Sequence, residues 1–153
     1  MQSSAQKVHI SISRQTLELF HGGRLLRSYA VSTSKFGEGS EPGSCKTPLG
    51  RFRIAEKIGG GTALGEIFKS RVATGKIGGE GEEDDFVETR ILWLDGLDPG
   101  NRNTCGRYIY IHGTNHESQI GTKASHGCVR MRNAEIVELF ELVGEGTEVL
   151  IGA

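Results

Sequence analysis

The chain has 153 residues, a length that suits one domain with its own hydrophobic core. Its 18 Lys and Arg residues nearly balance its 19 Asp and Glu residues, which gives a formal net charge of −1. This balance excludes a nucleic-acid binder that relies on bulk positive charge. The sequence has no run of 18 or more apolar residues, so we expect no transmembrane helix.

Two features of the sequence bear on its compartment. The residues after Met1 lead into a β-like alternation rather than an apolar signal core, so we expect a cytoplasmic protein. A periplasmic or cell-envelope location is the alternative if an export signal has been removed. The three cysteines are too few for a disulfide framework, although a bridge between Cys45 and Cys105 stays open in an oxidising compartment.

Short apolar segments separated by glycine-rich turns predict a mainly β fold. Val8, Ile10 and Ile12 alternate with polar residues, which is typical of a half-buried strand. Residues 21–24 predict a hairpin turn. In chain order the expected strands are 8–12, 17–20, 25–32, 51–55, 67–72, 90–94, 108–111 and 147–151.

The segment 57–90 is harder to interpret than the rest. It contains three consecutive glycines at 59–61 and an acidic run at 78–85, and we expect a mobile excursion from the sheet. We interpret the acidic run as a solvated loop rather than a metal site. Whether the excursion forms a lid over a site stays open.

One helix is predicted near the C-terminus. Asn133 is the expected N-cap and Gly144 fits the position just beyond the last turn. The apolar residues between them recur with the spacing of one helical face that packs on a sheet, namely Ile136, Leu139, Phe140 and Val143. The expected architecture is therefore a β-sheet or β-sandwich with one principal helix.

Reactive side chains gather in two segments late in the sequence. The segment 108–115 contains His112, and the segment 125–133 contains Cys128, sixteen positions later. A free cysteine has a pKa of about 8.5, so little thiolate exists at neutral pH unless an imidazole accepts the proton. The connection is long enough for the chain to return and bring the two side chains together. We therefore predict Cys128 as a nucleophile and His112 as its base.

Neighbouring residues suggest further roles. An imidazole base needs a partner that fixes its tautomer, and the Gly113 carbonyl is a candidate. Gly127 allows close approach of the backbone, so its N–H and that of Cys128 are candidates for an oxyanion hole. Of Arg130 and Arg132, at least one is expected to orient an anionic peptide through its guanidinium group.

The string Ser125-His126-Gly127-Cys128-Val129-Arg130-Met131, with His112-Gly113 upstream, resembles the L,D-transpeptidase (YkuD) catalytic domain. That family's pattern is a His, a gap of similar length, and then Ser/Thr-His-Gly-Cys, an apolar residue and Asn or Arg. The segment Thr47-Pro48-Leu49-Gly50-Arg51-Phe52 is similar to the family's Thr-Pro-x-Gly-x-Phe segment. The resemblance covers about residues 7–151, so it implies one catalytic domain across 1–153.

The resemblance implies a β-sandwich fold, no cofactor, and peptidoglycan tetrapeptide stems as substrates. Cys128 would attack the bond between an L-diamino acid and D-Ala and release D-Ala from a thioester. The acyl group would pass to water, as in an L,D-carboxypeptidase of cell-wall recycling, or to an amine in 3→3 cross-linking. His112 would be the base, oriented by Gly113, and acylation of Cys128 by carbapenems is also implied. The residues implied to shape the pocket or bind substrate are Ser125, His126, Gly127 and Arg130.

Several alternatives stay open at this point. Position 130 is Arg where many cross-linking members have Asn, and the expected cytoplasmic location favours water as the acceptor. A zinc-binding domain is a rival hypothesis, with Cys105, His112, His116, His126 and Cys128 as candidate ligands. A non-catalytic module that holds stem peptides is a second rival.

Overall fold

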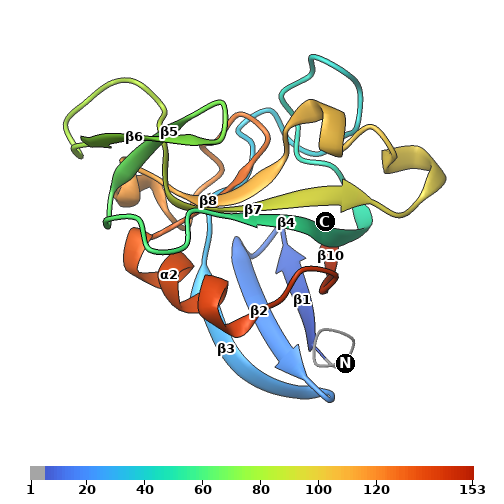
Figure 1. The fold of residues 1–153 in the computed structure, drawn as a ribbon. Coiled ribbons are helices and arrows are strands. Elements are labelled where there is room, and N and C mark those ends of the chain that lie inside the picture. Colours follow the sequence, from blue (N-terminus) through green and yellow to red (C-terminus); the bar gives the residue numbers. More distant parts are fainter. Residues whose placement is uncertain (1–5) are drawn as a thin grey trace.

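The computed structural model describes residues 6–153 (Figure 1), so the expectation for residues 1–5 lies outside the described part. The strands are β1 (Gln6–Ser11), β2 (Thr16–His21), β3 (Arg24–Ala30), β4 (Gly50–Ile58), β5 (Glu66–Lys69), β6 (Val72–Ile77), β7 (Val87–Gly96), β8 (Tyr110–Gly113), β9 (Val129–Met131) and β10 (Glu148–Gly152). The helix is α2 (Asn133–Leu142), and three short 3₁₀ turns are η1 (Pro99–Asn101), η2 (Cys105–Arg107) and η3 (Glu117–Gln119).

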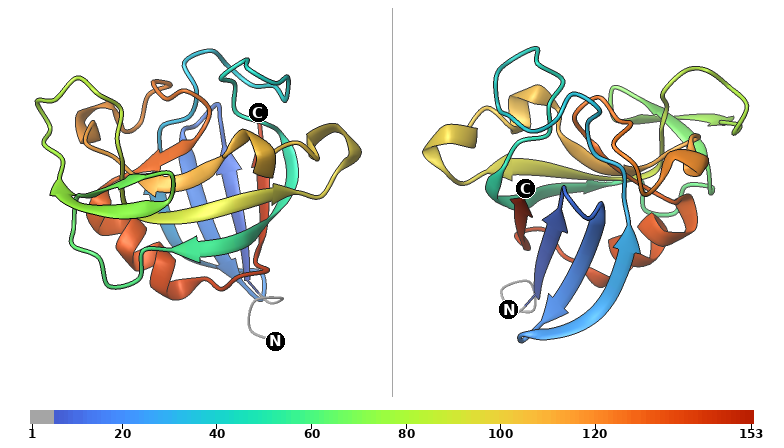
Figure 2. Two further views of the ribbon diagram at one scale, coloured as in Figure 1. Left: turned by 45° about the horizontal axis from the view of Figure 1, so that its top comes forward. Right: turned by 180° about the vertical axis from the view of Figure 1, so that it is seen from behind.

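All ten strands belong to one mixed sheet. Its main path runs β3-β2-β1-β10-β4-β7-β5-β6, while β8 pairs with β7 and β9 pairs with β8. The β1–β10 and β8–β9 pairs are parallel and the remaining strand pairs are antiparallel. The sheet folds over, so that the arm of β1, β2 and β3 lies across β4, β7 and β8 (Figure 2). The predicted mainly β fold with one late α-helix is confirmed.

The core lies between the two arms of the folded sheet and under α2. Alternating residues of β1, β2 and β4 point inward, and Phe52 and Ile54 of β4 are fully buried. The helix contributes Ile136, Leu139 and Phe140, and Val143 just after it is also buried. The apolar stripe predicted from helical spacing is therefore confirmed.

The structure corrects two expected strands and adds one that was not expected. Residues 67–72 do not form one strand, because Ser70 and Arg71 adopt positive φ angles of 48° and 66° and turn the chain from β5 into β6. The strand expected at 108–111 begins only at Tyr110, since Tyr108 adopts a left-handed conformation after η2. Strand β9 was not expected, because its three residues are too short to show a period.

The expected N-cap, Asn133, is instead the first helical residue, and Arg132 occupies the cap position. The Asn133 side chain lies near the end of β8. It donates to the Thr114 carbonyl at 3.0 Å and accepts from Thr89 Oγ1 at 2.6 Å. Its own N–H donates to the Glu117 carboxylate at 2.6 Å, which places a negative charge at the helix N-terminus. The asparagine therefore connects β7, the chain after β8 and α2.

Within residues 6–153, the single α-helix is too short and too polar to cross a bilayer.

Glu88 on β7 is a buried carboxyl group beside this network. Burial is the main cause that raises its pKa from 4.5 to about 7, and the charges of Glu117, Glu82 and Glu80 add to the shift. The Asn133 amide donates to Oε1 at 3.3 Å, while Oε2 lacks a partner among the described residues.

Glu88→Gln is expected to remove a pH dependence of stability. Because the folded state holds this proton more tightly, the free energy of unfolding should fall as pH rises from about 4.5 to about 7. The shift corresponds to about 3 kcal/mol, fully lost above pH 8. Urea unfolding at pH 5 and pH 8 checks this, with exposed Glu83→Gln as control. An equal pH dependence in Glu88→Gln and the parent would contradict the assignment.

Candidate active site

The parallel pairing of β8 and β9 places the reactive residues on one face of the sheet. Ile111 pairs with Val129 and His112 with Arg130, and Ile111 and Val129 are fully buried in the core. Because side chains alternate along a strand, His112 and Arg130 emerge on the opposite face. Cys128 immediately precedes β9, and continuing the register places it opposite Tyr110, on the same face as His112 and Arg130.

The loop that carries Cys128 is held by its own residues. Ser125 is buried, and its hydroxyl donates to the Cys128 carbonyl at 2.6 Å and accepts from the Gly127 N–H at 3.3 Å. Gly127 has a φ of +126°, a region that side chains with a Cβ rarely adopt. An added Cβ there would also meet the Lys46 carbonyl at 3.4 Å. Ser125 and Gly127 therefore set the position of Cys128 in this loop.

The Thr47 segment explains why a second motif accompanies the first. Thr47 is fully buried, and its hydroxyl donates to the Gly127 carbonyl at 3.0 Å. The same oxygen accepts the Ser34 N–H at 3.0 Å. Gly50 has a φ of +115° and no room for a Cβ beside the Asp98 carboxylate. The segment that begins at Thr47 thus supports the loop that carries Cys128.

The imidazole of His112 is fixed by its neighbour's backbone. His112 is 3% exposed, and its Nδ1 lies 2.5 Å from the Gly113 carbonyl oxygen. This bond requires a proton on Nδ1, so Nε2 is the nitrogen left to accept one. Burial lowers the pKa of His112, although the Gly113 carbonyl and the Asp85 charge act in the opposite direction.

The Cys128 thiol is partly exposed and has two backbone contacts. The Tyr110 N–H donates to Sγ at 3.3 Å, and Sγ donates to the Tyr108 carbonyl at 3.4 Å. Burial raises the pKa of the thiol to about 11, with the Tyr110 N–H acting against it and Asp85 adding to it. The two shifts act in the same sense, because burial favours the neutral thiol of Cys128 and the neutral imidazole of His112.

Arg130 is buried on the same face and already has an anionic partner. Its side chain is 2% exposed, with NH2 at 2.8 Å from Asp85 Oδ2 and NH1 donating to Gln119 Oε1 at 2.7 Å. His126 is exposed, and its Nδ1 lies 3.0 Å from the same Asp85 oxygen. The sequence predicts that Arg130 binds a carboxylate of the substrate. In this structure the carboxylate that Arg130 contacts is that of Asp85.

Asp85 is the residue that sequence reasoning missed. It lies in the acidic run 78–85, which was interpreted as a solvated loop. Its own sequence neighbourhood carries no signal for this role, because the contact depends on how the loop returns to β9.

The remaining candidates lie around the site or away from it. His116 lies in a loop, and its Nε2 is 2.9 Å from the Glu82 carbonyl oxygen. The Cys105 carbonyl accepts the Trp93 indole N–H at 3.1 Å. Arg132 is a surface residue beside Glu135. Across residues 6–153 no three His, Cys, Asp or Glu side chains are grouped so that they could hold a metal ion, so the zinc hypothesis finds no ligand set in this part of the chain.

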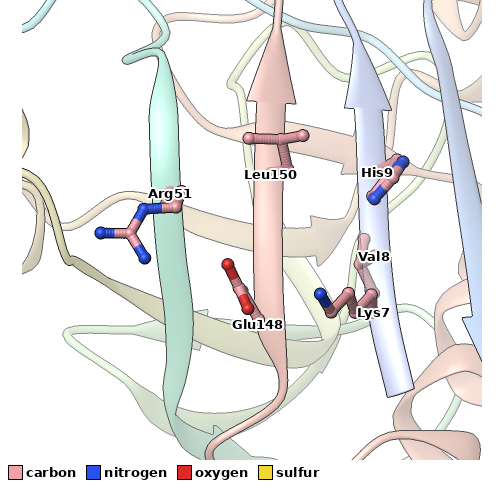
Figure 3. A pocket seen from close by; sticks show the side chains of 6 residues that line it. All are labelled: Lys7, Val8, His9, Arg51, Glu148 and Leu150. Atoms are coloured by element: carbon pink, nitrogen blue, oxygen red, sulfur yellow. The ribbon is translucent and has the colours of Figure 1, made fainter. Parts of the chain in front are cut away.

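A shallow pocket elsewhere belongs to a different surface. It lies over β1, β10 and β4 and is lined by Lys7, Val8, His9, Arg51, Glu148 and Leu150 (Figure 3). None of these residues belongs to the segments that carry His112 and Cys128. This pocket is therefore separate from the candidate active site.

Comparison with known proteins defines the class. The family model of the YkuD L,D-transpeptidase catalytic domain matches residues 5–151, so the chain belongs to the L,D-transpeptidase (YkuD) catalytic domain family. The Bacillus subtilis (strain 168) protein YqjB, which carries the name of an L,D-transpeptidase, is 32% identical over 80% of this chain and 57% of its own length. The chain thus spans less than two thirds of that relative.

Solved structures show the same fold. An L,D-transpeptidase from Mycobacterium smegmatis has a TM-score of 0.63 at 16% identity, covering 97% of this chain and 59% of that one. L,D-transpeptidase 3 from Mycobacterium tuberculosis, in complex with a faropenem-derived adduct, has a TM-score of 0.62 at 14% identity, covering 97% of this chain and 60% of that one. The expected L,D-transpeptidase-like fold is confirmed.

Thr47→Val is expected to destabilise the protein and to slow reactions at Cys128. The change keeps the side-chain shape but leaves the Gly127 carbonyl and the Ser34 N–H without their partner. Each buried group left unpaired costs about 1–3 kcal/mol. Thermal unfolding and the rate of thiol alkylation measure the two effects. The exposed Thr122→Val is the control, and equal losses in both variants would contradict the role of Thr47.

Alkylation of Cys128 should report a raised pKa. In a Cys45→Ser, Cys105→Ser background the only thiol is Cys128, and its rate of reaction with iodoacetamide should keep rising with pH toward about 11. The reason is that burial disfavours the thiolate. A rate that reaches its plateau below pH 7 would instead indicate a resting thiolate–imidazolium pair.

Proposed function

We propose that the protein is a cysteine-dependent acyl-transfer enzyme acting on peptidoglycan tetrapeptide stems. The observation that carries the proposal is the β8–β9 pairing, which puts a partly exposed Cys128 on the same face of the sheet as a His112 whose tautomer is fixed by Gly113. Membership of the L,D-transpeptidase family supports the substrate class. The faropenem-derived adduct in the M. tuberculosis relative supports a site that β-lactam compounds can reach.

The proposed first step forms a thioester. Nε2 of His112 takes the Cys128 proton, and the thiolate attacks the carbonyl carbon between the L-diamino acid and D-Ala. The Gly127 and Cys128 N–H groups are the proposed donors to the oxyanion, and the Gly127 N–H then exchanges its 3.3 Å bond with Ser125 for this one. The C–N bond breaks, the imidazolium returns its proton to the amine, and D-Ala leaves.

The second step releases the acyl group. A water molecule or an amine attacks the thioester carbonyl while His112 accepts its proton, and the thiol is regenerated when the C–S bond breaks. Water yields a trimmed tripeptide, and an amine of a second stem yields a 3→3 cross-link. We propose water as the preferred acceptor, since position 130 is Arg where many cross-linking members of the family have Asn.

A neutral pair suits this chemistry. A neutral imidazole is ready to accept a proton, and a neutral thiol beside it avoids a charge in a desolvated site before substrate arrives. The ion pair then forms together with the bond to the substrate. This order differs from that of an enzyme in which the thiolate exists at rest.

Cys128→Ala and His112→Ala should each reduce release of D-Ala from tetrapeptide by at least about a thousandfold, because each removes one half of the nucleophile–base pair. Both variants should remain folded by circular dichroism. The exposed Cys45→Ser serves as the matched control and should keep parental activity. Full turnover by folded Cys128→Ala would rule out the mechanism.

Mass spectrometry of the products distinguishes water from an amine as the acceptor, and it distinguishes an enzyme from a non-catalytic binder. Tetrapeptide is incubated with and without a second stem that carries a free amine, and the products are identified as tripeptide or cross-linked dimer. Dominant dimer in the presence of the amine would overturn the preference for water. Incubation with a carbapenem should add one covalent adduct on Cys128, and a non-catalytic stem-peptide binder without a reactive thiol would give none.

A further inference from the structure

The loop 78–86 is fixed to the catalytic face by backbone and side-chain contacts. Asn115, which is 3% exposed, donates from Nδ2 to the Asp84 carbonyl at 2.8 Å and accepts the Phe86 N–H at 3.0 Å. His116 contacts the Glu82 carbonyl, and Glu80 accepts the Glu117 N–H at 3.0 Å. The loop was expected to be mobile, yet these contacts tie it to the chain just after His112.

These contacts bring the Asp85 carboxylate onto the segment 125–133 that carries Cys128. Oδ2 lies 2.8 Å from Arg130 NH2 on β9 and 3.0 Å from His126 Nδ1 in the catalytic loop. The Asp85 side chain is 30% exposed, while that of Arg130 is 2% exposed. A guanidinium so deeply buried requires a nearby anion, because an unpaired buried charge is strongly destabilising.

We propose that Asp85 is a positioning residue of the cysteine–histidine pair, which supplies the anionic charge facing His112 and holds Arg130 and His126 around Cys128. This inference deepens the proposed function and rests on it. Asp85 acts on the reacting groups through space and through Arg130, and it touches neither the thiol nor the imidazole in any contact of the described residues.

The charges around this carboxylate come from three elements. They are His112 of β8, Arg130 of β9 and His126 of the catalytic loop. Partial burial raises the pKa of Asp85, but these three groups lower it by more, so the net shift is downward. At His112 and at Cys128, the negative charge of Asp85 raises the pKa, and the positive charge of Arg130 acts in the opposite direction. Asp85 therefore favours the imidazolium that forms on proton transfer and keeps the resting thiol protonated.

Removal of the charge should move both ionisations to lower pH. In Asp85→Asn with Cys128 as the only thiol, iodoacetamide alkylation at pH 8 should be about three- to tenfold faster, since one pKa unit is a factor of ten in thiolate. The acid limb of the pH profile of kcat/KM on tetrapeptide should move to lower pH in the same variant. A residue that merely braced the loop would change rates uniformly and would leave both pH profiles in place.

Matched variants separate the effect of the Asp85 charge from other effects of a substitution in this loop. Asp84→Asn changes the neighbouring exposed residue and should leave both pH profiles unchanged, and Asp85→Glu should restore the parental profiles. If Asp85→Asn does not fold, Asp85→Asn/Arg130→Gln removes the pair as a unit and should shift the alkylation profile in the same direction by a smaller amount. Unchanged profiles in a folded Asp85 variant, or an equal shift in Asp84→Asn, would overturn the proposal.

The alkylation readout keeps this test separate from the proposed function. Iodoacetamide reacts with the thiol without any stem peptide, so a shifted profile together with no turnover of tetrapeptide would sink the proposed substrate while the role of Asp85 survived. Turnover of tetrapeptide together with an unshifted alkylation profile in Asp85→Asn would support the proposed function and overturn the role of Asp85.

Discussion

The site depends on the parallel pairing of two very short strands, β8 and β9. Their register buries Ile111 and Val129 in the core and thereby turns His112, Cys128 and Arg130 to the other face. A slip of one residue would exchange these two sets and turn the charged and reactive groups into the apolar core. The strength of the hydrophobic core is therefore what fixes the geometry of the chemistry.

Much of the surrounding structure can be understood as support for that register. Ser125 and Thr47 hold the loop before β9 from two sides, and Asn133 joins the chain after β8 to α2. Thr89 occupies a positive φ of 75° within β7, a strained conformation for a β-branched residue, and its hydroxyl is bonded to Asn133. Thr47, Thr89 and Ser125 are buried and Asn133 is half-buried, and the polar side chain of each is paired, which is what a rigid site requires.

Much of the fold and the pair of reactive residues could be predicted from the sequence. Alternation revealed β1, and helical spacing revealed α2, because these elements are long enough to show a period. Strand β9 has three residues and no such signal, and the β5–β6 turn uses Ser70 and Arg71 where glycine would have marked it. Asp85 lay in an acidic run whose partners are more than forty positions away, so only the folded chain could reveal it.

The position of β10 has a consequence for how the protein forms. This strand, the last in the sequence, lies between β1 and β4 in the sheet (Figure 1). During synthesis the arm of β1, β2 and β3 can pair locally, but it joins β4 only after residues 148–152 have left the ribosome. Until then β1 and β4 both expose open edges to other chains. The nascent protein is therefore most exposed to aggregation just before its final strand arrives.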